Sequence, residues 1–189
     1  GGGGGGVLHS GPVRRWGTNL GASCVRLVGP SHLLLGSADG GPIRICHVER
    51  SGVVGLYDDP EPPLGATSAL CTDGATLAAT NTYSRAQLRA WDLEARTLTD
   101  RISLPGGAHG ARCLQMQPHT LLAGCSNGWV VLCDRRSGRV ESRLEHGACV
   151  NSIHVHEARR ALVCATDDAV VRLTDLRTLG TYASHSLRL

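Results

Sequence analysis

A short segment of alternating apolar and polar residues recurs four times along the chain at nearly constant spacing. The copies occupy residues 43–47, 88–92, 130–134 and 171–175. Their last residues are 45, 42 and 41 positions apart. Such alternation over a few residues is typical of a half-buried β-strand. The chain is therefore organised by a repeat, and each copy of the repeat is expected to form one unit of the fold.

Each unit contains further strand-like segments around this copy. Apolar segments that end in small residues precede the copies, at 33–37, 77–80, 121–125 and 162–166. Another strand lies upstream in each unit, at 23–27, 68–71, 112–116 and 150–154, and a weaker one lies downstream, at 53–57, 97–102, 140–144 and 180–182. Turn residues separate the two central strands at 39–41, 127–128 and 167–168, whereas the connection at 81–87 is longer. The sequence thus predicts an all-β fold with four strands per unit.

This pattern resembles WD40 repeats, which form the blades of β-propellers. The Trp-Asp pair of that family occurs once, as Trp91-Asp92. Cys133 and Thr174 replace the Trp in two other units, and Cys46-His47 replaces the whole pair in the first. Traces of the family's Gly-His pair stand at His109-Gly110 and His146-Gly147. The resemblance implies a WD40-type β-propeller with about four blades of four antiparallel strands.

The resemblance also divides the chain into two parts. Residues 1–11 are Gly-rich and are interpreted as a flexible tail, and residues 12–189 as propeller blades. The repeats lie approximately at 18–57, 66–102, 109–144 and 146–182. Because a propeller closes into a ring and four blades is the low end of the known range, we interpret the chain as the C-terminal part of a larger propeller. Its degenerate repeats are loosely similar to those of F-box/WD-repeat proteins.

The composition indicates a soluble protein with a sizeable core. Apolar residues make up 41% of the chain, and Phe is absent, so smaller side chains have to fill the core. The eight cysteines all lie in apolar, strand-like segments: Cys24, Cys46, Cys71, Cys113, Cys125, Cys133, Cys149 and Cys164. We predict that they are reduced thiols in a cytoplasmic protein, with the nucleus as an alternative compartment. No segment resembles a signal peptide or is long enough to span a membrane.

His146, Thr166 and Asp168 have the residue types of a catalytic triad. The resemblance to WD40 blades implies a different role for them, a buried hydrogen-bond relay that ends at Thr174. We therefore predict a structural relay and no enzymatic activity. His154 and His156 lie on one side of a strand but lack further ligands nearby, so no metal site is predicted. No phosphate-binding motif follows the Gly-rich stretches, so no cofactor is expected either.

The predicted fold sorts the charged residues onto two opposite ends of the blades. One end collects Arg50, Arg96, Arg135, Arg136, Arg139, Arg159, Arg160 and Arg177. The other end collects Asp39, Asp58, Asp59, Glu61, Glu145, Asp167 and Asp168. The formal net charge of +3 is too small to indicate a nucleic-acid partner by itself.

A rigid blade assembly with short loops is suited to binding other proteins. We therefore expect a non-catalytic protein–protein interaction scaffold. The likeness to F-box/WD-repeat proteins would make it the substrate-recognition part of a ubiquitin ligase receptor. We expect a basic peptide or a ligase substrate to bind at the acidic end, through Asp39, Asp58, Asp59, Tyr83, Arg85, Trp129 and Asp167. The alternative is an RNA- or nucleosome-binding propeller that uses the arginines.

Overall fold

The computed structural model describes residues 21–50, 52–61, 65–81, 87–105 and 110–186. Within these ranges it contains sixteen strands and one short 3-10 helix, Glu157–Arg159. The strands are β1 Ala22–Val28, β2 His32–Ser37, β3 Ile43–His47, β4 Gly52–Tyr57, β5 Thr67–Thr72, β6 Thr76–Asn81, β7 Gln87–Asp92, β8 Leu98–Ser103, β9 Ala111–Met116, β10 Thr120–Cys125, β11 Trp129–Asp134, β12 Arg139–Glu145, β13 Val150–His156, β14 Ala161–Thr166, β15 Val170–Asp175 and β16 Gly180–Ser186. The predicted tail, residues 1–11, lies outside the described residues.

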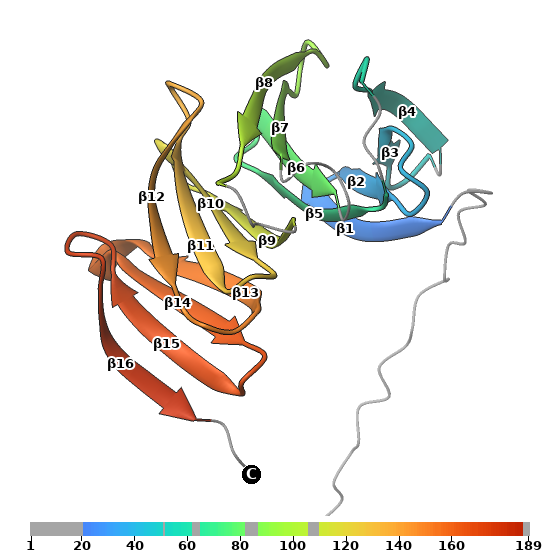
Figure 1. The fold of residues 1–189 in the computed structure, drawn as a ribbon. Coiled ribbons are helices and arrows are strands. Elements are labelled where there is room, and N and C mark those ends of the chain that lie inside the picture. Colours follow the sequence, from blue (N-terminus) through green and yellow to red (C-terminus); the bar gives the residue numbers. More distant parts are fainter. Residues whose placement is uncertain (1–20, 51, 62–64, 82–86, 106–109, 187–189) are drawn as a thin grey trace, which may run out of the picture.

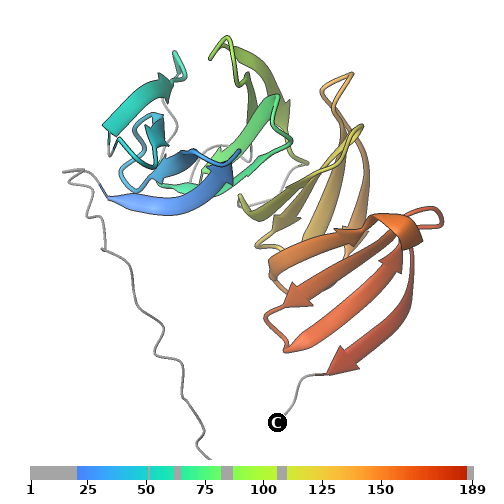
Figure 2. The same cartoon turned by 180° about the vertical axis from the view of Figure 1, so that it is seen from behind.

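The strands form four separate sheets of four antiparallel strands each, in sequence order. We call them sheet 1 (β1–β4), sheet 2 (β5–β8), sheet 3 (β9–β12) and sheet 4 (β13–β16). The sheets follow one another along an arc, with sheet 1 and sheet 4 at its two ends (Figures 1 and 2). This arrangement confirms the predicted all-β fold of four-stranded units and fits a β-propeller-like repeat architecture. The described residues do not form a closed ring.

Local sequence explains why each unit folds as two consecutive hairpins. The predicted Asn127-Gly128 turn is present, and Gly128 has a φ of +87°. Glycine adopts this conformation without a steric clash because it has no Cβ. Its amide donates to the carbonyl of Cys125 and closes the hairpin between β10 and β11. None of the described residues belongs to a helix that is both long and apolar enough to cross a membrane.

The first strands of neighbouring sheets lie side by side along the inner edge of the arc. A side-chain hydrogen bond is repeated there. The Ser23 hydroxyl donates to the carbonyl of Thr67 at 2.6 Å, and the Ser68 hydroxyl donates to the carbonyl of Ala111 at 2.8 Å. The equivalent position in β9 is Arg112, which cannot make this short contact, so the two serines fix the spacing of the first three sheets only.

The core lies between the sheets, because every sheet has two apolar faces. We call the face toward the preceding sheet the backward face and the face toward the following sheet the forward face. Between sheets 1 and 2, Leu34, Ile43 and Tyr57 pack on Leu70, Leu77 and Trp91. Between sheets 2 and 3, Ala78, Leu88 and Ile102 pack on Leu114, Leu121 and Cys133. Between sheets 3 and 4, Leu122, Val130 and Leu144 pack on Ile153, Leu162 and Cys164.

Burying one such leucine contributes about 1.5–3 kcal/mol to folding. The three interfaces are close enough to exclude side chains at some positions. A Cβ added to Gly124 would stand 2.5 Å from Cys113 Sγ and 2.7 Å from Val150 Cγ1, well inside contact distance. Gly124 therefore lets the first strand of sheet 4 approach β10.

We expect Gly124→Ala to destabilise the protein by about 1–3 kcal/mol, because the added methyl group overpacks the interface between sheets 3 and 4. Gly52→Ala is the matched control, since the nearest atom to its added Cβ is the carbonyl oxygen of Arg50 at 3.8 Å. Chemical denaturation of both variants measures the difference. Equal stability of the two variants would show that the sheets do not pack as closely as described.

Candidate functional site

The acidic end of the sheets holds the connections between second and third strands and those between successive sheets. The structure places Asp39, Asp58, Asp59, Trp129 and Asp167 at this end, where the sequence predicted them. Tyr83 and Arg85 fall outside the described residues, so their placement stays a prediction.

Asp59 is engaged in ion pairs within the protein. Its side chain is 3% exposed and lies between two arginines of sheet 2. Arg89 Nε approaches one carboxylate oxygen at 3.4 Å, and Arg101 binds the other. Burial raises the pKa of Asp59, but the hydrogen bonds from Arg101 and the Glu61 amide and the charges of both arginines outweigh it, so the pKa lies below its ordinary value. Asp59 thus joins sheets 1 and 2, and the expectation that it binds a partner stays a prediction.

Other acidic-end candidates are also engaged within the protein. Arg143 lies over the Trp129 ring, 4.4 Å from its centre, and Trp129 packs against the core between sheets 2 and 3. Asp39 accepts a hydrogen bond from the Ser37 hydroxyl, and Asp167 accepts one from the Asn151 amide. Asp58 is exposed, although its backbone carbonyl accepts the Trp91 indole N–H at 2.9 Å.

Two members of the predicted relay are hydrogen-bonded to each other. The Thr166 hydroxyl donates to Asp168 at 2.5 Å, and Arg172 binds both residues. The hydrogen bonds from Arg172 and Thr166 hold the pKa of Asp168 far below its usual range. Thr174, at the predicted end of the relay, instead contacts the Thr181 hydroxyl at 3.2 Å.

His146 Nε2 does not take part in the hydrogen bonds of this cluster. This atom is buried and has no hydrogen-bond partner among the described residues. Burial, and then the charge of Arg172, lowers the pKa of His146, while Asp168 acts in the opposite direction. Sequence reasoning placed His146 in the relay because it could not foresee that Arg172 would take the position beside Thr166 and Asp168.

All eight cysteines are free thiols, as the sequence predicted. Burial raises the pKa of Cys71, Cys125, Cys133 and Cys164 to about 12. A protonated, buried thiol is a poor nucleophile and metal ligand. No group of three or more His, Cys, Asp or Glu side chains is placed to hold a metal ion within the described part of the chain.

The arginine end holds the connections between first and second strands and those between third and fourth strands. Carboxylates from the same connections interrupt its positive charge. Arg135 pairs with Asp73 at 2.6 Å, and Arg177 pairs with Asp175 at 2.7 Å. The predicted arginine cluster is therefore a mixed surface of both signs.

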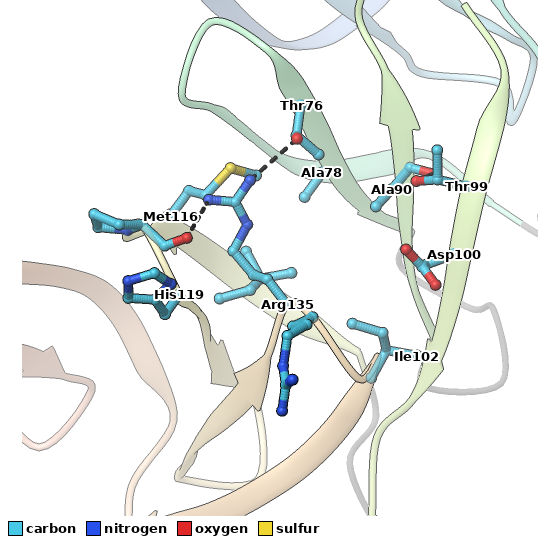
Figure 3. A pocket seen from close by; sticks show the side chains of 12 residues that line it. Thr76, Ala78, Ala90, Thr99, Asp100, Ile102, Met116, His119 and Arg135 are labelled. Carbon is cyan, nitrogen blue, oxygen red and sulfur yellow. Dashed lines mark hydrogen bonds between the residues drawn. The ribbon is translucent and has the colours of Figure 1, made fainter.

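Two clefts open at the arginine end, one on each side of the turn between β9 and β10. The smaller, which we call the 2/3 cleft, lies between sheets 2 and 3 and has a volume of about 250 Å³. Figure 3 shows Arg135 reaching across it to Thr76, and Asp100 and Thr99 on the opposite wall. The Arg135 guanidinium donates to Thr76 Oγ1 at 3.0 Å and to the carbonyl of Gln117 at 2.8 Å, so its donors are largely used by acceptors of the protein itself.

The larger 3/4 cleft lies between sheets 3 and 4 and has a volume of about 560 Å³, within the range of ligand-binding clefts. Leu122, Leu132 and Val155 form its apolar floor. Its rim carries Leu179, which is 36% exposed, together with charged side chains of both signs: Glu141, Glu157, Arg160 and Arg177.

Leu179 is the functional candidate that sequence reasoning missed. It occupies the turn position held by Arg96 in sheet 2 and Gly138 in sheet 3, and all three have a φ near +60°, between 56° and 64°. A bulky apolar residue is rare in this conformation. A leucine where the second and third repeats carry Arg and Gly was the available signal.

No protein family and no curated protein matches the sequence. The fold is common among solved structures, where 1478 chains match it. One is the crystal structure of the computationally designed protein Ika8, with a TM-score of 0.70 and 14% sequence identity. The match covers 85% of this chain and 48% of the designed chain, so this chain spans about half the length of that protein. At this identity the likeness concerns the fold alone.

We expect Arg89→Met to destabilise the protein by about 3 kcal/mol, because it leaves the buried Asp59 carboxylate with one partner fewer. Arg177→Met is the control, since the Arg177 side chain is 64% exposed and its loss should leave stability unchanged. Denaturant titration of both variants at neutral pH gives the comparison. If both substitutions lower the free energy of unfolding by similarly small amounts, the buried Asp59 carboxylate does not depend on Arg89.

The depressed pKa of His146 predicts a pH dependence. The folded state favours the neutral ring, so its stability is complete above the unfolded pKa of about 6.5 and declines as the pH falls below that value. His146→Leu should raise the free energy of unfolding by about 1 kcal/mol at neutral pH and reduce the acid sensitivity. Thermal unfolding at neutral pH and at a pH below the unfolded pKa measures the acid sensitivity of both proteins. A substitution at an exposed histidine, His119→Leu, is the control. Unchanged acid sensitivity in His146→Leu would contradict it.

Proposed function

We propose that the chain forms blades of a WD40-type β-propeller and acts as a non-catalytic scaffold that binds a protein segment at the arginine end. The observation that carries the proposal is the 3/4 cleft, with its apolar floor and the exposed Leu179 on its rim. A cleft of about 560 Å³ accommodates a few side chains of an extended segment rather than a whole domain.

The charges on the rim suggest the kind of segment. Glu141 and Glu157 stand near Arg160 and Arg177, so both signs are available at the mouth of the cleft. An apolar side chain of the segment would pack on the floor of the cleft. Charged residues on either side of it would pair with the charged side chains of the rim. Such a contact gains most of its affinity from the buried apolar anchor and its orientation from the rim.

This choice of end differs from the one that the sequence favoured. Most of the acidic-end candidates are engaged in contacts within the protein, and the cavity near Asp59 measures only about 10 Å³. A partner there would have to break ion pairs or displace Arg143 from Trp129. The 3/4 cleft at the arginine end has an apolar floor that a partner can reach without breaking such contacts.

A scaffold agrees better with the side-chain geometry than a hydrolase does. The Thr166 hydroxyl donates to Asp168 and not to an imidazole, and His146 Nε2 has no partner among the described residues. If the likeness to F-box/WD-repeat proteins holds, the bound segment belongs to a substrate of a ubiquitin ligase. The alternative of RNA or nucleosome binding has less support, because the pairs Arg135–Asp73 and Arg177–Asp175 neutralise part of the arginine end.

Peptides selected from a random library on the 189-residue chain should lose at least tenfold in affinity for Leu179→Asn, since the change removes about 1.4 kcal/mol or more of apolar contact. Asn tolerates the positive φ, so the fold should be preserved. Arg96→Asn, at the equivalent turn position of sheet 2 and outside both clefts, is the matched control and should bind normally.

Two results would overturn the proposal. One is that the selected peptides bind Leu179→Asn normally and lose affinity for Trp129→Ala with Asp58→Ala, which would place the site at the acidic end. The other is that the chain binds single-stranded RNA tightly and loses that binding steeply as salt rises, which would favour the nucleic-acid alternative.

A further inference from the structure

The 2/3 cleft lies where sheet 2 carries two small side chains. Ala78 and Ala90 are cross-strand neighbours on the forward face of sheet 2, and both line this cleft. The same pair of positions holds larger apolar residues in the other three sheets: Leu34 and Ile45, Leu122 and Leu132, and Val163 and Leu173. Sheet 2 therefore leaves open, next to sheet 3, space that larger side chains occupy in the other repeats.

The two clefts share a wall. Pro118 and His119, in the turn between β9 and β10, line both clefts and are exposed. A segment bound in the 3/4 cleft can therefore pass over this turn and enter the 2/3 cleft. Packed sheets are about 10 Å apart and an extended chain advances about 3.3 Å per residue, so about three residues separate the side chains that enter the two clefts.

The 2/3 cleft has room for one long side chain. Its volume of about 250 Å³ lies below the range of clefts that hold a complete small ligand. Ile102 and Leu121 line it together with the two alanines, so much of its wall is apolar. The cleft is therefore suited to the stem of a single side chain that belongs to a larger partner.

Asp100 gives the 2/3 cleft a carboxylate without an ionic partner. The strand register places it beside Ala90, on the wall that β8 contributes (Figure 3). Asp100 is exposed, and no ion pair joins it to another side chain in the described part of the chain. Arg135, which lines the same cleft, pairs with Asp73 at 2.6 Å instead.

Arg136 is the other arginine of this lining, and it has a carboxylate in its own turn. Asp134 accepts the Arg136 amide at 3.0 Å. Hydrogen bonds from Ser137 and from this amide, and then the charge of Arg136, lower the pKa of Asp134. Asp100 is thus the carboxylate of the 2/3 cleft that a cation from outside the chain would meet.

We propose that the segment bound in the 3/4 cleft continues over Pro118 and His119 and places an arginine or lysine side chain in the 2/3 cleft. The aliphatic stem packs on Ala78 and Ala90, and the cation pairs with Asp100. The recognised motif is a large apolar residue and, about three residues from it, a basic residue. This inference rests on the proposed function, because it extends the segment that the 3/4 cleft holds.

Peptides selected from a random library on the 189-residue chain test this motif. Their alignment should show an apolar position and, about three residues from it, Arg or Lys. Asp100→Asn should lower their affinity up to about fivefold, as the loss of an exposed ion pair does, and added salt should reduce the difference. Glu94→Gln is the matched control, because Glu94 is an exposed acid of the same sheet that lines neither cleft.

Two further variants separate the charge of the 2/3 cleft from its space. Asp100→Arg should lower affinity about tenfold, and a peptide with Glu in place of its basic residue should recover the loss. Ala90→Leu introduces the residue that sheet 3 carries at the equivalent position, so it should fill the cleft and preserve the fold, which thermal unfolding checks. Peptides with and without the basic residue should then bind Ala90→Leu equally.

The outcomes distinguish this inference from the proposed function. If Leu179→Asn lowers peptide affinity while Asp100→Asn, Asp100→Arg and Ala90→Leu bind like the wild type, the segment stays within the 3/4 cleft and the inference is wrong. An acidic residue at the second position of the selected peptides would also overturn it, since the cleft would then bind through Arg136. If Leu179→Asn binds normally as well, the proposed function fails and this inference fails with it.

Discussion

Packing of one sheet face on another is the interaction on which this structure depends. Each four-stranded sheet is apolar on both faces, so no sheet can remove its own apolar surface from water. The three interfaces between sheets 1, 2, 3 and 4 supply nearly all of the core. The strand ends and their connections are left free of this packing requirement, and the clefts and charged residues are found there.

The strand position that carries Trp in the resembled family holds side chains of very different size in the four sheets. Trp91 fills it in sheet 2, and Cys46, Cys133 and Thr174 fill it in the other sheets. Trp91 Nε1 donates to the carbonyl of Asp58, so the large side chain also anchors the connection between sheets 1 and 2.

Sequence reasoning identified the sheets because their signals are local. Strand alternation and turn residues such as Asn127-Gly128 lie within a few positions of each other, and the predicted segments overlap the strands of all four sheets. The contacts that decide the site join distant residues: Asp59 and Arg89 are brought together only when sheet 2 docks on sheet 1. The 3/4 cleft likewise depends on the offset between two sheets, which no single repeat encodes.

One feature of the buried charges was nonetheless readable in the sequence. Arg44, Arg89 and Arg172 occupy the same position on their backward faces, and Val131 replaces them in sheet 3. Each arginine has a carboxylate near it. Asp39 in the turn of sheet 1 lies near Arg44, and Asp168 in the turn of sheet 4 pairs with Arg172. Asp59, in the connection that precedes sheet 2, pairs with Arg89. The turn of sheet 3 and the connection before it, residues 126–128 and 104–110, contain neither Asp nor Glu. Because an unpaired charge is costly to bury, the position without a carboxylate carries valine.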